Sequence, residues 1–105
     1  MKPLIIASGA NGHPTFCIPT PDYVNGVVLT ASSAESITIP AGAKHVIFSS
    51  TADFYASYGG TATVITDTTD GTGSELNPVA RTLGAADTIS VISESACNIT
   101  ACFYV

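Results

Sequence analysis

Short apolar runs alternate with turn-forming residues along most of this chain. Beyond residue 26 the runs are rich in Val, Ile, Thr and aromatic residues, and Gly, Pro, Asp and Ser separate them. No stretch keeps the 3.6-residue period of an amphipathic helix over a useful length, so the pattern predicts strands. We expect them at residues 27–31, 36–39, 44–49, 53–58, 61–66, 79–83, 88–93 and 98–105, with a further short strand at 4–7.

The last predicted strand shows the clearest alternation. Its odd-numbered positions are apolar, and its even-numbered positions are mostly polar, which is typical of a strand with one face on a core. The residues expected on the core face are Cys97, Ile99, Ala101, Phe103 and Val105. Cys97 and Cys102 are an odd number of residues apart, so they should point to opposite faces and cannot hold one ion together.

The segment between residues 8 and 26 has a different character. It contains three prolines, three glycines and two asparagines and shows no sustained period. Proline removes a backbone donor and favours extended geometry in the residue before it, so this segment should cross a surface without joining a central strand. We predict one domain in two parts: an N-terminal strand and extended arm at 1–25, and a β-sandwich or barrel at 26–105.

Composition points towards contacts with other proteins. The chain has 105 residues, enough for one domain, and 46% of them are hydrophobic. Only 10% are charged, against about 25% in an average soluble domain. Low charge suits surfaces that lie against other protein. The alternative interpretation of the same composition is a secreted β domain rich in Ser and Thr.

Charge and targeting signals exclude several classes of partner. The net charge is −5, and Lys2, Lys44 and Arg81 are the only basic residues, so we expect no direct binding to nucleic acid or to anionic membranes. No apolar run approaches the ~20 residues of a membrane span. The apolar run near the N-terminus is also too short for the apolar core of a signal peptide. We therefore expect synthesis and folding in the cytoplasm.

Candidate catalytic and metal-binding residues are few. His13 and His45 are the only side chains that titrate near neutrality, and no nucleophile elbow accompanies them. Three cysteines without CxxC spacing indicate neither a disulfide framework nor a zinc site. The loop 67–75 offers oxygen ligands but lacks the spacing of a calcium loop. We expect no enzyme activity, no cofactor and no metal.

Two stretches of the chain resemble small structural proteins of tailed-bacteriophage virions. They are IPAGAKHVIFSSTADFY at 39–55, continuing to Gly59 and Gly60, and DGTGSELNP at 70–78. The shared pattern is a strand, turn and strand that end in Asp-Phe-Tyr, then a Ser-Glu-Leu-Asn-Pro loop, an arginine and a final pair of strands. The resemblance covers residues 36–104 and leaves out the N-terminal arm.

The resemblance implies a fold and a place of action. The fold would be an all-β, jelly-roll-like β-sandwich of about eight antiparallel strands. The protein would be a capsid decoration, or cement, protein on the virion surface, where it bridges subunits of the major capsid protein and associates with its own copies as a homotrimer. The residues expected to meet partners are Pro14, Phe16, Pro19 and Tyr23 in and beside the arm, and Glu75, Asn77 and Arg81 near the loop.

Two other functions use the same fold. A tail, fibre or baseplate module could bind a host-surface glycan through Tyr55, Tyr58 and the loop 70–77, because aromatic faces beside Asn and Asp suit sugars. Strand aromatics more often serve a core or a protein interface. A small enzyme of cupin-like shape is disfavoured because the sequence lacks clustered histidine ligands.

Overall fold

The computed structural model describes residues 1–13 and 17–105, and this part of the chain is all-β. No helix long and apolar enough to cross a membrane occurs among these residues. The described residues form eight strands: β1 (Val24–Leu29), β2 (Glu35–Thr38), β3 (His45–Ser50), β4 (Tyr55–Tyr58), β5 (Glu75–Leu76), β6 (Ala80–Thr82), β7 (Thr88–Ile92) and β8 (Cys97–Tyr104).

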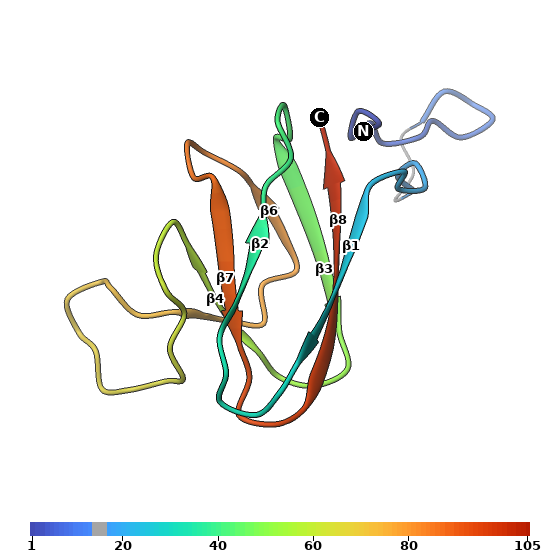
Figure 1. Ribbon diagram of the computed structural model, residues 1–105. Helices are drawn as coiled ribbons and strands as arrows, with labels where there is room; N and C mark the ends of the chain where they lie inside the picture. The colour runs from blue at the N-terminus through green and yellow to red at the C-terminus, as the bar shows by residue number, and fades with distance from the viewer. Residues whose placement is uncertain (14–16) are drawn as a thin grey trace.

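The strands form two four-stranded antiparallel sheets that pack face to face (Figure 1). One sheet has the order β1-β8-β3-β6 and the other has the order β2-β7-β4-β5. The chain crosses between the sheets at nearly every connection, and this order of eight strands is that of a jelly roll. The predicted jelly-roll-like β-sandwich is therefore confirmed.

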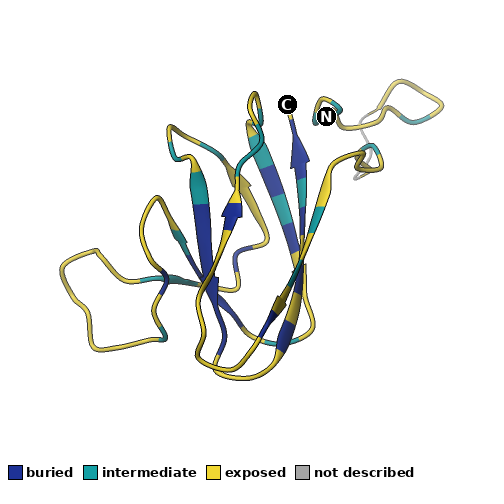
Figure 2. Ribbon diagram, viewed as in Figure 1, coloured by how far each residue is buried: buried dark blue, intermediate teal, exposed yellow. Residues whose placement is uncertain are grey.

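The core lies between the two sheets and follows the alternation of the sequence. In β8, Cys97, Ile99, Ala101 and Phe103 are buried in it, whereas Asn98 and Thr100 are exposed. The other strands supply Val46 and Phe48 from β3 and Ile89 and Val91 from β7, among others. Figure 2 shows buried residues in the strands of both sheets, whereas most of the loops are exposed. Cys97 and Cys102 point to opposite faces of β8, as predicted.

A second, smaller apolar cluster lies on the outer face of the sheet β2-β7-β4-β5. Tyr55 and Ile92 are paired neighbours there, and Ala62 and Val64 from the long β4–β5 loop pack onto them. The Ala62 N–H donates a hydrogen bond of 2.9 Å to the buried Oγ of Ser90. The loop therefore covers part of a sheet face that would otherwise meet water.

Two predicted strands are not formed. Residues 61–66 belong to this covering loop and have no strand partner, so their apolar positions pack onto a sheet and do not extend it. Residues 4–7 also form no strand, although the Leu4 N–H donates to the Val105 carbonyl at 3.1 Å. Conversely, residues 75–76 were expected in a loop but form β5. β1 begins three residues earlier than expected. Two backbone-paired residues such as those of β5 leave no periodicity to detect.

The inward residues of β8 should dominate stability. Replacing the fully buried Phe103 by Ala removes a ring from the core and should lower the free energy of unfolding by about 3–5 kcal/mol. The exposed Val79→Ala should change it by less than about 0.5 kcal/mol. Urea denaturation followed by circular dichroism measures both values. Equal, small losses in the two variants would mean that β8 does not form the core.

Candidate interaction surfaces

The root of the N-terminal arm is fixed to one end of the sandwich. The Lys2 carbonyl accepts a hydrogen bond from the Val105 N–H (3.0 Å), next to the bond between Leu4 and Val105. Asp22 receives the Lys2 N–H at 3.0 Å and lies 3.6 Å from the terminal amino group of Met1. These contacts hold the beginning of the arm against its end, so residues 5–13 and 17–18 lie outside the points at which the arm is attached.

The outer part of the arm exposes large apolar side chains. Ile5 and Ile6 are 63% and 56% exposed, and Ile18 is also exposed. Residues 3–21 contain no charged side chain. Lys2, Pro3, Ile5, Ala7, Ile18 and Pro19 line a hollow of about 290 Å³. A surface of this composition, standing away from the core, is typical of a segment that packs against another protein.

The arm makes the molecule larger than its mass requires. The radius of gyration is 15.0 Å, against about 13 Å for a compact domain of this length. The accessible surface is 6318 Å², against roughly 5,500 Å² for a monomer of this mass.

The predicted partner residues of the arm differ in their surroundings. The Pro19 carbonyl accepts a hydrogen bond from the buried Tyr104 hydroxyl at 3.0 Å, which ties the arm to β8. Burial raises the pKa of this hydroxyl. Tyr23 is part-exposed and packs edge-on against Phe103, with ring centroids 6.0 Å apart. Pro14 and Phe16 lie outside the described residues.

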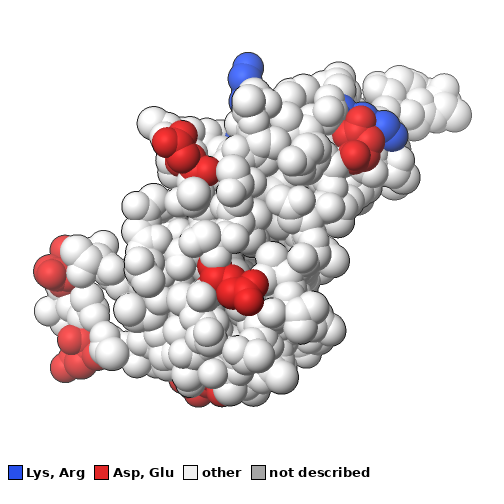
Figure 3. Space-filling view, viewed as in Figure 1, with Lys and Arg blue, Asp and Glu red and all other residues white. Residues whose placement is uncertain are grey.

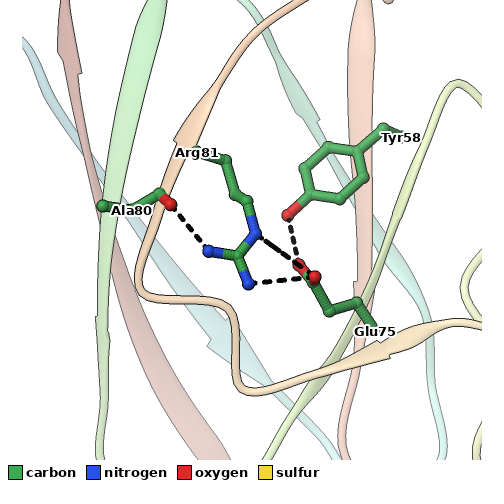
Figure 4. Close-up of polar contacts among 4 residues, drawn as sticks. All are labelled: Tyr58, Glu75, Ala80 and Arg81. Atoms are coloured by element: carbon green, nitrogen blue, oxygen red, sulfur yellow. Dashed lines mark hydrogen bonds and ion pairs between the residues drawn. The ribbon is translucent and has the colours of Figure 1, made fainter.

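The predicted rim residues Glu75 and Arg81 meet at the opposite edge of the sandwich. The Arg81 Nε donates to both carboxylate oxygens of Glu75 at 3.0 and 3.2 Å, and Nη2 donates at 3.0 Å (Figure 4). The Tyr58 hydroxyl donates to the same carboxylate at 3.0 Å. These three residues, the edge cluster, come from β4, β5 and β6, so the cluster joins the two sheets where both end.

The strand registers explain why the edge cluster forms. Glu75 pairs with the inward-facing Ala56, and Arg81 pairs with the inward-facing Val46. Both charged side chains therefore point into the space between the sheets, at the open edge where no further strand covers the core. The bidentate pair closes this edge with a charge-assisted bond. The hydrogen bonds also shift the titration of all three groups.

The pKa of the Glu75 carboxyl lies below its usual range, chiefly because Arg81 donates hydrogen bonds to it. The same bonds raise the pKa of Arg81. Burial, and then the bond to Glu75, raise the pKa of Tyr58. At neutral pH, Glu75 and Arg81 are therefore both charged, and Tyr58 is a neutral hydrogen-bond donor. A hollow of about 320 Å³ beside it is lined further by Leu83 and Ala86.

Asn77, the third predicted rim residue, is engaged within the chain. Its side-chain oxygen accepts the Phe54 N–H at 3.0 Å, and its Nδ2 donates to Asp53 at 2.8 Å. Its backbone has a positive φ of 47°, a conformation that Asn tolerates better than most residues. Asn77 thus shapes the turn after β5, and its polar groups are already occupied.

The tyrosines of the glycan hypothesis do not share a surface. Tyr55 is 8% exposed and lies under the β4–β5 loop, whereas Tyr58 belongs to the edge cluster. In that loop, Asp70 accepts hydrogen bonds from the N–H and hydroxyl of Thr72, which lower the pKa of the Asp70 carboxyl. No group of three or more His, Cys, Asp or Glu side chains within residues 1–13 and 17–105 is placed to hold a metal ion.

The structure thus separates the predicted partner residues into two regions. Pro19 and Tyr23 lie beside β1 and β8, and the edge cluster lies at the β5 and β6 edges on the other side of the sandwich. Sequence reasoning missed the exposed isoleucines of the arm. The signal that could have identified them is the run of uncharged residues from 3 to 21. Comparison of the chain with known protein families, with curated proteins and with solved structures finds no match.

Glu75→Gln tests the edge cluster by its pH dependence. The folded-state pKa of Glu75 is lowered, so the stabilisation is fully present above the ordinary carboxyl value of about 4.3 and is lost as the pH falls through the folded value. Glu75→Gln should therefore lower the free energy of unfolding at pH 7, by less than Phe103→Ala does, and the difference from the wild type should shrink towards pH 3.

Glu35→Gln is the matched control, because it removes the same charge from an exposed position on β2. It should leave the pH dependence of the wild type intact. Urea denaturation at a series of pH values gives the comparison. A constant difference between Glu75→Gln and the wild type down to pH 3 would mean that the ion pair does not stabilise the fold.

Proposed function

We propose that this protein is a structural component of a bacteriophage virion, a capsid decoration protein that stabilises the head by bridging subunits of the major capsid protein. Its other partners are further copies of itself. It is made in the host cytoplasm and ends on the capsid surface. Its function rests on contact area, with no enzymatic step.

The observation that carries this proposal is the N-terminal arm. It stands out from a folded domain, exposes Ile5, Ile6 and Ile18, and carries no charge between residues 3 and 21. A protein that bridges subunits needs a compact body and an apolar segment that reaches a neighbour. The jelly-roll topology and the virion-like motifs at 39–55 and 70–78 agree with this use, although the fold alone serves many functions.

The exposed isoleucines of the arm should carry the attachment. Replacing Ile5, Ile6 and Ile18 by Ser together removes apolar surface without touching the bonds of the arm root, so the fold should persist. The occupancy of the variant on heads of the parent phage should fall about tenfold or more, because each buried isoleucine contributes about 1.5–3 kcal/mol. Quantitative gel analysis of purified heads after incubation with the protein measures this.

Ile65→Ser with Val79→Ser serves as the control, because both residues are 64% exposed or more and lie outside the arm. This variant should bind heads as the wild type does. Unchanged occupancy of the arm variant would remove the arm from the attachment. Labelling of the tail and not the head, by immuno-electron microscopy, would replace capsid decoration by a tail or baseplate role.

A further inference from the structure

The four outer edges of the two sheets are not equivalent. The edges are β1 and β6 in one sheet and β2 and β5 in the other. β2, β5 and β6 have four, two and three residues, and they contain Glu35, Glu75 and Arg81 respectively. Short length and charge are the usual protections of an edge strand against pairing with another chain. Three of the four edges are protected in this way.

β1 lacks these protections. It is the longest edge strand, with the six residues VNGVVL, and contains no charge and no proline. Val24 is 50% exposed and Val28 is 71% exposed. Such a strand is a template for the addition of a further strand.

The backbone of β1 has groups available for this pairing. The Phe103 N–H donates to the Tyr23 carbonyl at 3.0 Å, and the β1–β8 register continues from this pair. In an antiparallel pair the bonded positions alternate, so Asn25, Val27 and Leu29 bond to β8. The N–H and C=O groups of Val24, Gly26 and Val28 point away from β8. Within the described residues, no other backbone group bonds to them.

Gly26 lies at the centre of the free edge and has no role within the chain that explains it. Its φ is not in the left-handed region, and a Cβ built on it meets nothing within 4 Å. Glycine in the middle of a strand weakens the strand and often marks a close approach of another backbone. At Gly26 the free edge is the side on which the backbone N–H and C=O have no partner within the described residues.

We propose that the β1 edge pairs with the β1 edge of a second copy of this chain, antiparallel and centred on Gly26, to form a two-fold dimer with a continuous eight-stranded sheet. Gly26 then faces Gly26 of the partner subunit, and Val24 faces Val28 of the partner subunit in both directions. This register is self-complementary, as a two-fold interface requires. It replaces the homotrimer expected from the resemblance.

The distribution of charge favours a second copy as the occupant. Two chains of net charge −5 repel each other, so they can associate only through surfaces without acids. Between residues 3 and 34 the only charged residue is Asp22, and it is paired with Met1 and Lys2. The antiparallel register also brings Asp22 beside Thr30 of the partner subunit, away from like charge.

The root of the arm extends the same interface. Figure 1 shows the arm extending beyond the β1 side of the sheet. The antiparallel pairing brings the β1–β2 turn of the second copy next to the first residues of β1, where the arm joins the sandwich. Only the root of each arm therefore lies next to the partner subunit, and the outer part with Ile5, Ile6 and Ile18 stays exposed in the dimer.

Three substitutions test the dimer in the full-length protein. Gly26→Lys places two like charges on the two-fold axis, while the open space around Gly26 lets each chain keep its fold. Val28→Lys removes an apolar cross-strand contact in both halves. Each should raise the dimer dissociation constant about tenfold or more. Val79→Lys, at a valine that is 64% exposed outside β1, should leave the constant unchanged.

The double variant Val24→Lys with Val28→Glu tests the register. Only in the register centred on Gly26 does the new lysine of one copy face the new glutamate of the other, twice per dimer. The dimer dissociation constant of the double variant should therefore be lower than that of Val24→Lys or Val28→Glu alone. Sedimentation equilibrium gives the masses, with twice 10.6 kDa expected for the wild type, and circular dichroism checks the fold.

Several results would overturn the dimer. A wild type that stays monomeric at the highest soluble concentration, or a trimer that all of these substitutions leave intact, would exclude pairing through β1. If the dimer dissociation constant of the double variant is not lower than those of the single variants, the register centred on Gly26 is excluded. The measurements use no capsid, so their failure is distinct from a failure of the virion role.

Discussion

The pairing of β8 with two neighbouring strands is the interaction on which the rest of the structure depends. β8 is bonded to β1 on one side and to β3 on the other along most of its length. Its inward residues reach the centre of the core, and a slip of one residue would turn all of them to solvent. Its last residues also hold the arm, through Tyr104 and Val105. The register that builds the core therefore also fixes where the arm leaves the body.

A β-sandwich has two sides at which the edge strands leave the core uncovered, and the two sides of this protein differ in their charged residues. At the β5 and β6 side, Glu75, Arg81 and Tyr58 bond across the gap between the sheets and close it with polar groups. At the other side, β1 itself contains no charged residue, and the neighbouring Asp22 is paired with Met1 and Lys2. Figure 3 shows how sparse the charges are over the face it displays, including most of the arm. A domain of this size buries only about two thirds of the surface that its unfolded chain exposes, so the treatment of its open sides weighs on its stability.

The sequence predicted those parts of the fold that follow from local pattern. The alternation around Ile99 and Phe103 placed the buried face of β8 correctly from Cys97 to Phe103, because period two is a property of any half-buried strand. Val105, expected on the same face, lies beyond β8 and is exposed. The same reasoning failed for residues 61–66, where the apolar side chains of Ala62 and Val64 serve as a cover for another sheet. The meeting of Tyr58 with Glu75 and Arg81 was also out of reach, because it depends on the pairing of strands in two sheets. The exposure of Ile5 and Val28 depends on where the body ends, which no local pattern contains.

The arrangement of charge connects the virion proposal with the two-fold pairing. Apart from Asp22, the acidic residues lie in the loops and on the edge strands β2 and β5, whereas residues 3–34 contain only Asp22, which is paired with Met1 and Lys2. Antiparallel pairing of two β1 strands sets the two arm roots at opposite ends of the joined sheet. A dimer of this shape presents apolar segments in two directions, which a single chain cannot do. A two-ended particle can contact two separate subunits of a shell, so the proposed pairing is compatible with the proposed capsid role.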